Sequence, residues 1–492
     1  MTTFVSPMDS IYLWGESGAN PAHVIALQLF APPASGGPNV IERLYGEMTD
    51  PSRVKPEFRR RPHRSLGTAG QYTWVDDDEL DMTVQVRRVG LPAPGRIREL
   101  LEYVSSFHAV RLDRDRPLWE AHLVEGLSDG RFALCTKMHH ALFDGVTMGR
   151  HLLGGLSGDP DDRTGTAPWI IPAQTRDGRP RSRTSVSSLL RRAWTAIEVP
   201  AKLAGSTKAL VQAGVSVARD GDVAVPFSAP MTIFNGTVSS ARRFAGQQWP
   251  TERLRAISRA AEVSTNDVAL ALCAGALRTY LLEQETLPDS SLVAMVPMSF
   301  RPRTDDGSQK AGNNWGAVLC PLGTDVADPM TRLRNISRSM SRNKALMSEL
   351  DSNAAALVSA ANLGGVVLNM VPGLPLPPRP PFNLIISNVP AGTRTLYLDG
   401  CRLTDAYPVS VVSNGQALNI TLVSYAGQTA FGITGCRRSV PHLQHLLKYL
   451  DAAFVEFEEA LGLTDQHEKQ GSEASRWGRL RNRDTDDDQS TG

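Results

Sequence analysis

Two long stretches of mixed strand-like and helical patterning, separated by a segment of different composition, constrain this chain most strongly. The first stretch covers residues 1–158 and the second covers residues 227–464. Residues 159–226 connect them, and their first part is rich in Gly, Pro and charge, as crossovers and linkers are. A chain of 492 residues also exceeds what one ordinary hydrophobic core accommodates. We therefore expect an α/β protein with two domains joined by a linker.

The later part of the linker, residues 184–219, alternates basic and apolar side chains. Its basic residues are Arg191, Arg192, Lys202 and Lys208. Two interpretations of this segment remain: it lies on an anionic membrane surface, or it is a helix whose basic face is solvated. Residues 465–492, which end in RNRDTDDDQSTG, have the composition of a disordered tail.

Residues 352–378 contain no charged side chain, so they require a membrane check. Three asparagines, paired glycines and four prolines make this stretch a poor spanning helix. We expect a buried helix followed by a proline-rich loop. The alternatives are a segment that touches a membrane and a segment that lines an acyl chain.

The charge and cysteine counts exclude several classes of protein. Lys and Arg total 52 against 51 for Asp and Glu, which argues against a dedicated nucleic-acid binder. The five cysteines are scattered, odd in number and never at CxxC spacing, so neither a disulfide framework nor a zinc site is expected. The start of the chain, MTTFVSPMDSIYLW, lacks a secretory pattern. A reducing, cytoplasmic location fits these features best.

Residues 136–147, TKMHHALFDGVT, place two adjacent histidines ahead of an Asp-Gly pair. The preceding runs PLWEAHLVEGL and RFALCTKM are β-rich, and Ser128-Asp129-Gly130 between them signals a hairpin. If the second run is a strand, His139 and His140 point to opposite faces of its sheet. We therefore expect no chelating pair and no metal site.

One of the two histidines is then able to face a channel while the other is held in the scaffold. A neutral imidazole with a pKa near its ordinary value of about 6.5 accepts a proton from an alcohol at physiological pH. Asp144 suits a turn, a helix cap or an ion pair, and Gly145 permits the backbone conformation of the turn. The pattern indicates general-base chemistry.

The stretch HHALFDG resembles the HHxxxDG signature of acyltransferases related to chloramphenicol acetyltransferase and to peptide-synthetase condensation domains. The chain is more closely similar to the bacterial wax ester synthase/diacylglycerol acyltransferase family, especially its mycobacterial-type triacylglycerol synthases. Further stretches over most of residues 5–460 carry this resemblance: SPMDSIYLWGES, LDRDRPLWE, STNDVALALCAGALRTYL, VPMSFR and NLIISNVPAG.

The resemblance assigns roles to individual residues. It makes His140 the general base, leaves His139 and Asp144 mainly structural, and places Gly145 in the turn. It also matches two further motifs to substrate binding, PLW at Pro117, Leu118 and Trp119, and ND at Asn266 and Asp267. The alternatives are that PLW is only a packed strand and that the ND pair is only a helix cap.

The resemblance further implies two chloramphenicol-acetyltransferase-like domains, with mixed sheets flanked by helices and an active-site tunnel at their interface. His140 would remove a proton from an acceptor hydroxyl, and the oxygen would attack the thioester of a fatty acyl-CoA. No covalent acyl-enzyme is expected, because the sequence has neither a GxSxG elbow nor a convincing Cys-His nucleophile. No cofactor is expected, since acyl-CoA is a substrate.

The expected partners are long-chain acyl-CoA and an insoluble acceptor, either diacylglycerol or a long-chain alcohol. An insoluble acceptor favours peripheral contact with the inner membrane or with lipid droplets over a spanning anchor. The CoA phosphates call for basic groups near a tunnel mouth, for which residues 59–61 (all arginine), Arg301 and Arg303 are candidates, with solvated surface charge as the alternative.

Two other functions remain open at this point. One is a condensation-type acyltransferase that takes its acyl group from a carrier-protein thioester. The other is a non-catalytic protein that binds lipid or coats lipid droplets.

Overall fold

A computed structural model of the chain describes most of its residues, and the description is confined to them. The described ranges are 3–33, 39–68, 70–143, 145–163, 165–172, 223–300, 314–350, 352–370 and 375–463. Several predictions therefore lie outside the described residues: the role of Asp144, the basic segment 184–219, Arg301 and Arg303, and the tail 465–492.

The first half of the chain builds most of a six-stranded sheet with the order β12-β13-β2-β7-β6-β5. All neighbours are antiparallel except β5 and β6. Its strands are β2 (His23–Ala31), β5 (Val86–Gly90), β6 (Trp119–Glu125), β7 (Phe132–His139), β12 (Tyr397–Leu398) and β13 (Cys401–Val409). The helices of this half are α2 (Val40–Met48), α3 (Met82–Gln85), α4 (Ile97–Ala109) and α5 (Gly145–Gly154). The predicted hairpin is confirmed, because β6 and β7 pair on either side of residues 128–130.

The second half builds another six-stranded sheet with the order β10-β9-β11-β14-β15-β8. It is mixed, since β11 runs parallel to both β9 and β14. Its strands are β8 (Arg242–Pro250), β9 (Val293–Phe300), β10 (Asn314–Pro321), β11 (Leu384–Gly392), β14 (Leu418–Tyr425) and β15 (Gln428–Cys436).

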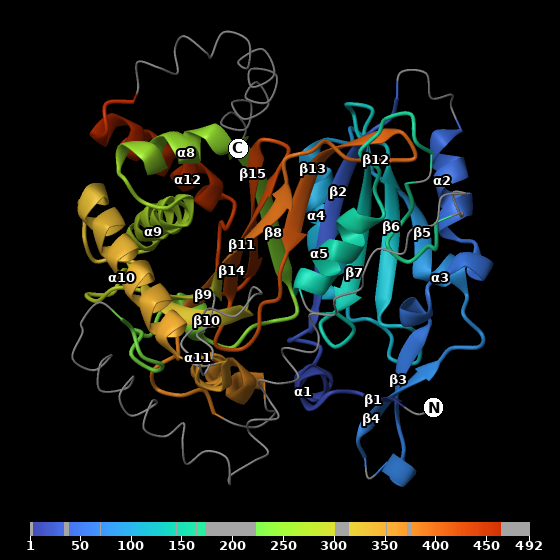
Figure 1. Cartoon of the computed structure of the whole chain (residues 1–492), viewed down its shortest axis with the longest axis horizontal. Coiled ribbons are helices and arrows are strands. Elements are labelled where there is room, and N and C mark those ends of the chain that lie inside the picture. The colour runs from blue at the N-terminus through green and yellow to red at the C-terminus, as the bar shows by residue number, and fades with distance from the viewer. Residues whose placement is uncertain are drawn as a thin grey trace, which may run out of the picture.

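A group of helices covers the outer side of this second sheet, as Figure 1 shows. They are α8 (Thr251–Ala260), α9 (Thr265–Glu283), α10 (Pro329–Glu349) and α12 (His445–Ala460). α9 contacts the other three, so nearly every position of its middle turns is buried, and its sequence is apolar all round rather than striped. The two sheets with their flanking helices give the two-domain α/β architecture expected from the sequence.

The second half of the chain contributes strands to the sheet of the first half. β13 lies late in the sequence, yet it pairs antiparallel with β2 and completes the first sheet. α4 contacts β2 of the first sheet and β8 of the second, and apolar side chains from both sheets bury against it. This pairing crosses the domain limits predicted at residues 158 and 227. The shared core around α4 holds the two sheets together.

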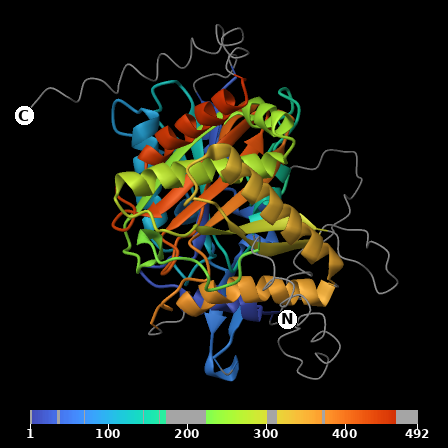
Figure 2. The same ribbon diagram turned by 90° about the vertical axis from the view of Figure 1, so that its left-hand side faces the viewer.

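A third, smaller unit lies at one end of the molecule (Figures 1 and 2). It contains the sheet β1-β4-β3 and two helices. Its elements are β1 (Thr3–Phe4), α1 (Pro7–Gly15), β3 (Arg60–Arg64), β4 (Tyr72–Asp76) and α11 (Ser352–Met370). Single 3-10 turns occur at Pro51–Arg53, Pro56–Phe58, Leu66–Thr68 and Ile233–Asn235.

The uncharged stretch after residue 351 forms the predicted helix, α11, and residues 375–380 follow it as an irregular segment. α11 contacts α1 and β10. None of the helices in the described part of the chain is both long enough and apolar enough to cross a membrane.

Candidate active site

The two histidines stand at the end of β7, which is the most buried strand of the first sheet. The backbone N–H of His139 donates to the carbonyl of Leu118 at 3.0 Å, and that of His140 donates to the carbonyl of Ala22 at 2.9 Å. The His139 side chain is fully buried, whereas His140 is half-buried. The strand therefore presents one imidazole to the scaffold and the other to a more open environment.

One hydrogen bond fixes the Nδ1 side of the His139 ring. Its Nδ1 accepts from the backbone N–H of Ala141 at 3.0 Å, so in the neutral ring the proton sits on Nε2. That Nε2 lies 3.6 Å from Oε1 of Glu16. An imidazole held in this way has one tautomer and one orientation, which suits a structural role for His139.

Glu16, the residue after α1, is the carboxylate that faces His139. Its Oε2 accepts from the Arg114 guanidinium at 2.8 Å, and its Oε1 accepts from the Ala22 N–H at 3.1 Å. Burial by itself raises the pKa of Glu16, but the contacts with His139, Arg114 and Ala22 lower it to about 2. Glu16 is therefore ionised at neutral pH, and its carboxylate faces the Nε2 side of the His139 ring.

Glu16 and Arg114 were not predicted as site residues from the sequence, although both lie in stretches that carried the family resemblance. Glu16 belongs to SPMDSIYLWGES and Arg114 belongs to LDRDRPLWE. A lone acid and a lone base in separate stretches give no local signal, because only the folded chain brings them together at the histidines.

His140 stacks on Tyr12 of α1, with ring centroids 5.0 Å apart and an interplanar angle of 16°. α1 is well anchored for this purpose, since the Ser6 Oγ accepts the N–H of Asp9 at its start and Pro7 stands in its first turn. Tyr12 thus covers one face of the His140 ring. Gly145 lies nearby in sequence as the first residue of α5.

The PLW residues are packed in the scaffold next to His139. All three side chains are buried, and Leu118 contributes its carbonyl to the N–H of His139. Trp119 stacks on Trp169 with centroids 4.7 Å apart, and its Nε1–H donates to the Phe58 carbonyl at 2.8 Å. The Pro117 carbonyl accepts from the Gln85 amide at 3.2 Å. These contacts favour the packed-strand alternative for the PLW motif.

The two residues of the ND motif have different surroundings at the start of α9. Asp267 forms a reciprocal capping box with Ser264, in which each side chain accepts the other's backbone N–H at 3.1 Å. Asn266 is half-buried, and its Oδ1 lies 3.5 Å from the Asn388 amide nitrogen of β11. The helix-cap alternative thus accounts for Asp267, whereas Asn266 joins two of the stretches that carried the resemblance.

Two of the three arginines at residues 59–61 have local partners. Arg59 donates to the Pro51 carbonyl at 3.0 Å, and Arg60 lies 3.5 Å from Asp76. These contacts favour the solvated-surface alternative for both residues over a phosphate site.

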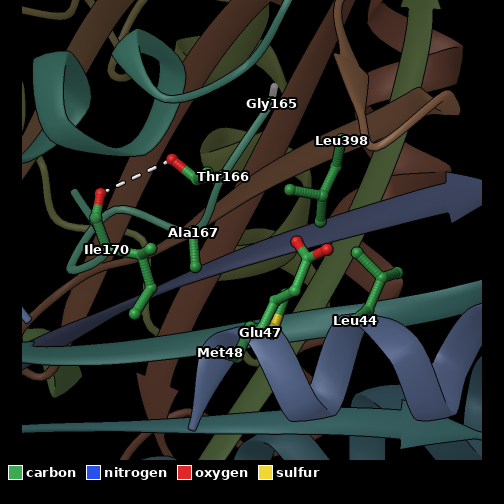
Figure 3. A pocket seen from close by; sticks show the side chains of 8 residues that line it. All are labelled: Leu44, Glu47, Met48, Gly165, Thr166, Ala167, Ile170 and Leu398. Carbon is green, nitrogen blue, oxygen red and sulfur yellow. Dashed lines mark hydrogen bonds between the residues drawn. The ribbon is translucent and has the colours of Figure 1, made fainter. Parts of the chain in front are cut away.

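A small hollow lies between α2, β12 and residues 165–170 (Figure 3). It measures about 200 Å³ including its solvent-open part, which is less than a typical small-molecule pocket. Glu47 lines it, and burial together with the nearby Asp399 raises the pKa of that carboxyl. None of the residues predicted for the active site is among its lining residues, so this hollow is separate from the histidines.

In the described part of the chain, no group of three or more His, Cys, Asp or Glu side chains is arranged to hold a metal ion.

Comparison with known proteins places the chain among acyltransferases. A sequence profile described as "Wax ester synthase/diacylglycerol acyltransferase catalytic domain" matches residues 5–269, and one described as "WS/DGAT C-terminal domain" matches residues 311–458. The chain is 44% identical over 461 residues to the probable diacylglycerol O-acyltransferase tgs2 of Mycobacterium tuberculosis, covering 93% of this chain and 99% of that protein. A putative diacylglycerol O-acyltransferase of Mycobacterium bovis is 38% identical over 445 residues, covering 90% of this chain and 88% of that protein.

Solved structures agree. The wax ester synthase/diacylglycerol acyltransferase from Marinobacter aquaeolei VT8 superposes with a TM-score of 0.72 at 36% identity, covering 94% of this chain and all of that one. The starter condensation domain of rhizomide synthetase RzmA gives a TM-score of 0.55 at 13% identity, covering 93% and 94% of the two chains. The latter likeness concerns the fold alone.

Proposed function

The chain belongs to the wax ester synthase/diacylglycerol acyltransferase family and is an acyl-CoA-dependent O-acyltransferase, and we propose that His140 is its general base. The substrates proposed are a long-chain acyl-CoA as donor and diacylglycerol, or a long-chain alcohol, as acceptor. Its products are triacylglycerol or wax ester and free CoA.

The reaction proceeds by direct transfer. The His140 imidazole takes the proton of the acceptor hydroxyl, and the oxygen attacks the thioester carbonyl of acyl-CoA. The tetrahedral oxyanion collapses, the carbon–sulfur bond breaks, and the CoA thiolate takes the proton from the imidazolium. The imidazole is thereby regenerated without a covalent acyl-enzyme.

One observation carries this assignment. Of the two adjacent imidazoles, His139 is fully buried and held beside an ionised Glu16, while His140 is half-buried and stacked on Tyr12. A base must reach the substrate hydroxyl, so the more open ring is the better candidate. In this proposal Glu16 and Arg114 are positioning residues that act through His139 and the end of β7.

Water competes with the acceptor hydroxyl, so the site must exclude it. α11 carries no charged residue and contacts α1, the helix that carries Tyr12. We propose that α11 lines the path of the acyl chain, which was one of the alternatives for this stretch. The tunnel between the two domains and the substrate roles of Pro117, Leu118, Trp119, Asn266 and Asp267 remain predictions, as does a cytoplasmic location with peripheral lipid contact.

The test is direct assay of the purified protein with labelled palmitoyl-CoA and a panel of acceptors that includes diacylglycerol and hexadecanol, followed by lipid chromatography. The wild type should form labelled ester, and His140→Ala should lower the rate by about 10²–10⁴-fold while the folded structure is kept. Near-normal turnover in that variant would remove His140 from the mechanism. A carrier-protein thioester that outcompetes palmitoyl-CoA as donor would favour the condensation-type alternative, and absence of any ester would favour the lipid-binding one.

A further inference from the structure

A fully buried lysine, Lys137, lies in β7 two residues before His139. Because side chains alternate along a strand, Lys137 and His139 point to the same face of the first sheet. Lysine is almost never fully buried unless it is paired. An apolar side chain of similar volume would often stabilise such a position at least as well as a buried charge does. The charge at Lys137 therefore indicates a specific role for this residue.

The ammonium group of Lys137 is surrounded by acceptors. Its Nζ donates to the carbonyls of Phe107 and Val110, each at 3.1 Å, and lies 3.4 Å from Oε2 of Glu120. The same nitrogen lies 3.9 Å from the centroid of the Phe107 ring, a cation–π contact. These three oxygens match the three N–H donors of an ammonium, whereas a neutral amine has only two. The geometry fits the charged form.

The carbonyls that Lys137 binds belong to the end of α4. The last carbonyls of a helix have no partner within it, and they carry the negative end of the helix dipole, which cations stabilise. The carbonyl of His108, between the two that Lys137 binds, accepts from Nε2 of His23 at 2.9 Å. His23 is the residue of β2 that pairs with His139. Two basic side chains next to His139 thus hold the end of α4.

The end of α4 leads directly to the ion pair beside the histidines. Arg114 follows Val110 by four residues, and its guanidinium donates to the Leu13 carbonyl at 2.6 Å and to Glu16 at 2.8 Å. α4 is also attached to the second sheet, since the Ser105 Oγ accepts the backbone N–H of Phe244 at 2.9 Å. Fixing α4 to β7 therefore fixes both the Arg114–Glu16 pair and the second sheet relative to the histidines.

Glu120, the counter-charge of Lys137, is itself held in place. Its Oε1 accepts from Nε2 of His122 at 2.8 Å, and the hydroxyl of Tyr103 in α4 donates to Nδ1 of the same ring. Burial raises the pKa of Glu120, but the contacts with His122 and Lys137 outweigh it and lower that pKa. The Glu120 carboxylate therefore stays ionised at neutral pH and connects Lys137 with a second point on α4.

We propose that Lys137 is a positioning residue for acyl transfer, whose ammonium charge fixes the end of α4 to β7 and so holds the Arg114–Glu16 pair at the histidines. Without that charge the acceptors at the end of α4 lose a donor, and the backbone that carries His139 and His140 shifts. This inference rests on the proposed function and deepens it.

The surroundings of Lys137 allow its charge to be varied by pH. Burial lowers the pKa of Lys137 to about 8, although Glu120 opposes the shift. The charged or titratable side chains that face it come from β2, β5, β6, α4 and the residue after α1, and they are His23, Arg87, Glu120, His122, Tyr103, His108 and Glu16. The pKa values of both glutamates and of His23 and His108 are lowered, and burial raises that of Tyr103. These five groups therefore keep their protonation states near pH 8, while Lys137 loses its charge.

Unfolding does not produce the same pH dependence. The unfolded chain keeps the lysine proton up to a pKa of about 10.5, the ordinary value, whereas the folded chain releases it near pH 8. The stability linked to Lys137 therefore rises between about pH 8 and about pH 10.5. A loss of activity that follows the titration of Lys137 in this range reports positioning and not loss of the fold.

The test measures kcat and KM of the full-length protein from about pH 7 to about pH 10 with labelled palmitoyl-CoA and hexadecanol, corrected for spontaneous thioester hydrolysis. The wild-type kcat should fall as the pH rises through about 8. Lys137→Met should lower kcat at pH 7 by at least about tenfold, with KM within about twofold and no further fall at higher pH. Lys137→Arg, which stays charged, should recover part of kcat and keep it to pH 10.

Glu120→Gln provides a test that leaves Lys137 in place. It removes the carboxylate that opposes the shift, so the fall in kcat should move to lower pH. Glu125→Gln, on the same strand and paired with the exposed Arg88, is the matched control and should keep the wild-type profile. If either Lys137 variant does not fold, as circular dichroism would show, the Glu120→Gln profile decides.

The proposal is overturned by a wild-type kcat in Lys137→Met, by a wild-type kcat that stays flat to pH 10, or by a fall that Glu120→Gln leaves in place. A fall in Lys137→Arg identical to that of the wild type would assign the titration to another group and overturn it too. Failure of the proposed function is distinct, because it appears as a wild type that forms no ester or as near-normal turnover in His140→Ala.

Discussion

The Glu16 carboxylate lies 3.6 Å from Nε2 of His139, and this contact joins the residue after α1 to the end of β7. The side chain of Glu16 is 1% exposed and that of His139 is fully buried. Arg114 binds the other carboxylate oxygen, so three groups from three separate stretches of sequence are held together. This arrangement fixes the backbone position of the neighbouring His140.

Glu16→Gln should therefore slow catalysis, although the proposed role of Glu16 involves no contact with the substrate. Loss of the charge loosens His139 and shifts the end of β7, and a misplacement of about 1 Å costs on the order of 10²-fold in rate. The loss should appear in kcat with little change in KM, the pH profile of kcat/KM should move, and Glu16→Asp should restore part of the rate. Glu125→Gln, which breaks the exposed pair with Arg88, is the control and should leave kcat unchanged. An equal fall in the two variants would argue against positioning.

The stacked ring of Tyr12 gives a second prediction. Tyr12→Phe keeps an aromatic ring against His140, whereas Tyr12→Leu removes it. Tyr12→Leu should therefore lower kcat by about tenfold more than Tyr12→Phe, because the imidazole loses the ring that orients it. Steady-state kinetics with one acyl-CoA and one alcohol measure the difference. Two variants with the same kcat would show that the stacking does not orient the base.

Substitutions of Trp119 distinguish a role of this residue in core packing from a role in substrate binding. It is fully buried, stacks on Trp169 and donates to the Phe58 carbonyl, so Trp119→Ala should cost about 3–5 kcal/mol of unfolding free energy. Denaturant unfolding measures this cost, and the KM for acyl-CoA of the milder Trp119→Phe should stay within about twofold of the wild type. A raised KM with unchanged stability would instead support the substrate role predicted from the motif.

Much of the architecture could be predicted from the sequence pattern. Alternation and turn signals were sufficient for the β6–β7 hairpin, and Ser264 with Asp267 follows the spacing of a capping box. The uncharged stretch after residue 351 was predicted to be a helix, and it forms α11. All of these are local properties, fixed by residues within one or two turns of each other.

What the sequence did not predict is long-range. β13 joins the first sheet because its side chains bury against β2, and strand alternation contains no information about which strand is the partner. Glu16 and Arg114 give no local pattern for the same reason. The tryptophan of the PLW motif was ambiguous because a large aromatic side chain suits a core and a pocket equally well.

The fully buried His108 gives the protein an acid-sensitive element. Both ring nitrogens lack a hydrogen-bond partner among the described residues, whereas its backbone carbonyl accepts from the His23 ring at 2.9 Å. Burial, with the nearby Arg242 and Lys137 charges, lowers the pKa of His108 to about 3. The unfolded chain, with a pKa near its ordinary value of about 6.5, binds the proton first.

Stability linked to His108 is thus fully present above pH 6.5 and is lost as the pH falls toward about 3, at about 1.4 kcal/mol per pH unit. Glu16, whose pKa is lowered to about 2, adds its own loss only below about pH 4.5. The window between pH 4.5 and 6.5 therefore separates the loss of stability linked to His108 from the loss linked to Glu16. His108→Phe keeps the carbonyl that binds His23 and removes the titrating ring, so its unfolding free energy should fall less steeply in that window and should not drop at pH 7. Urea unfolding at a series of pH values measures both quantities, and parallel curves for the variant and the wild type would show that His108 is protonated in the folded protein.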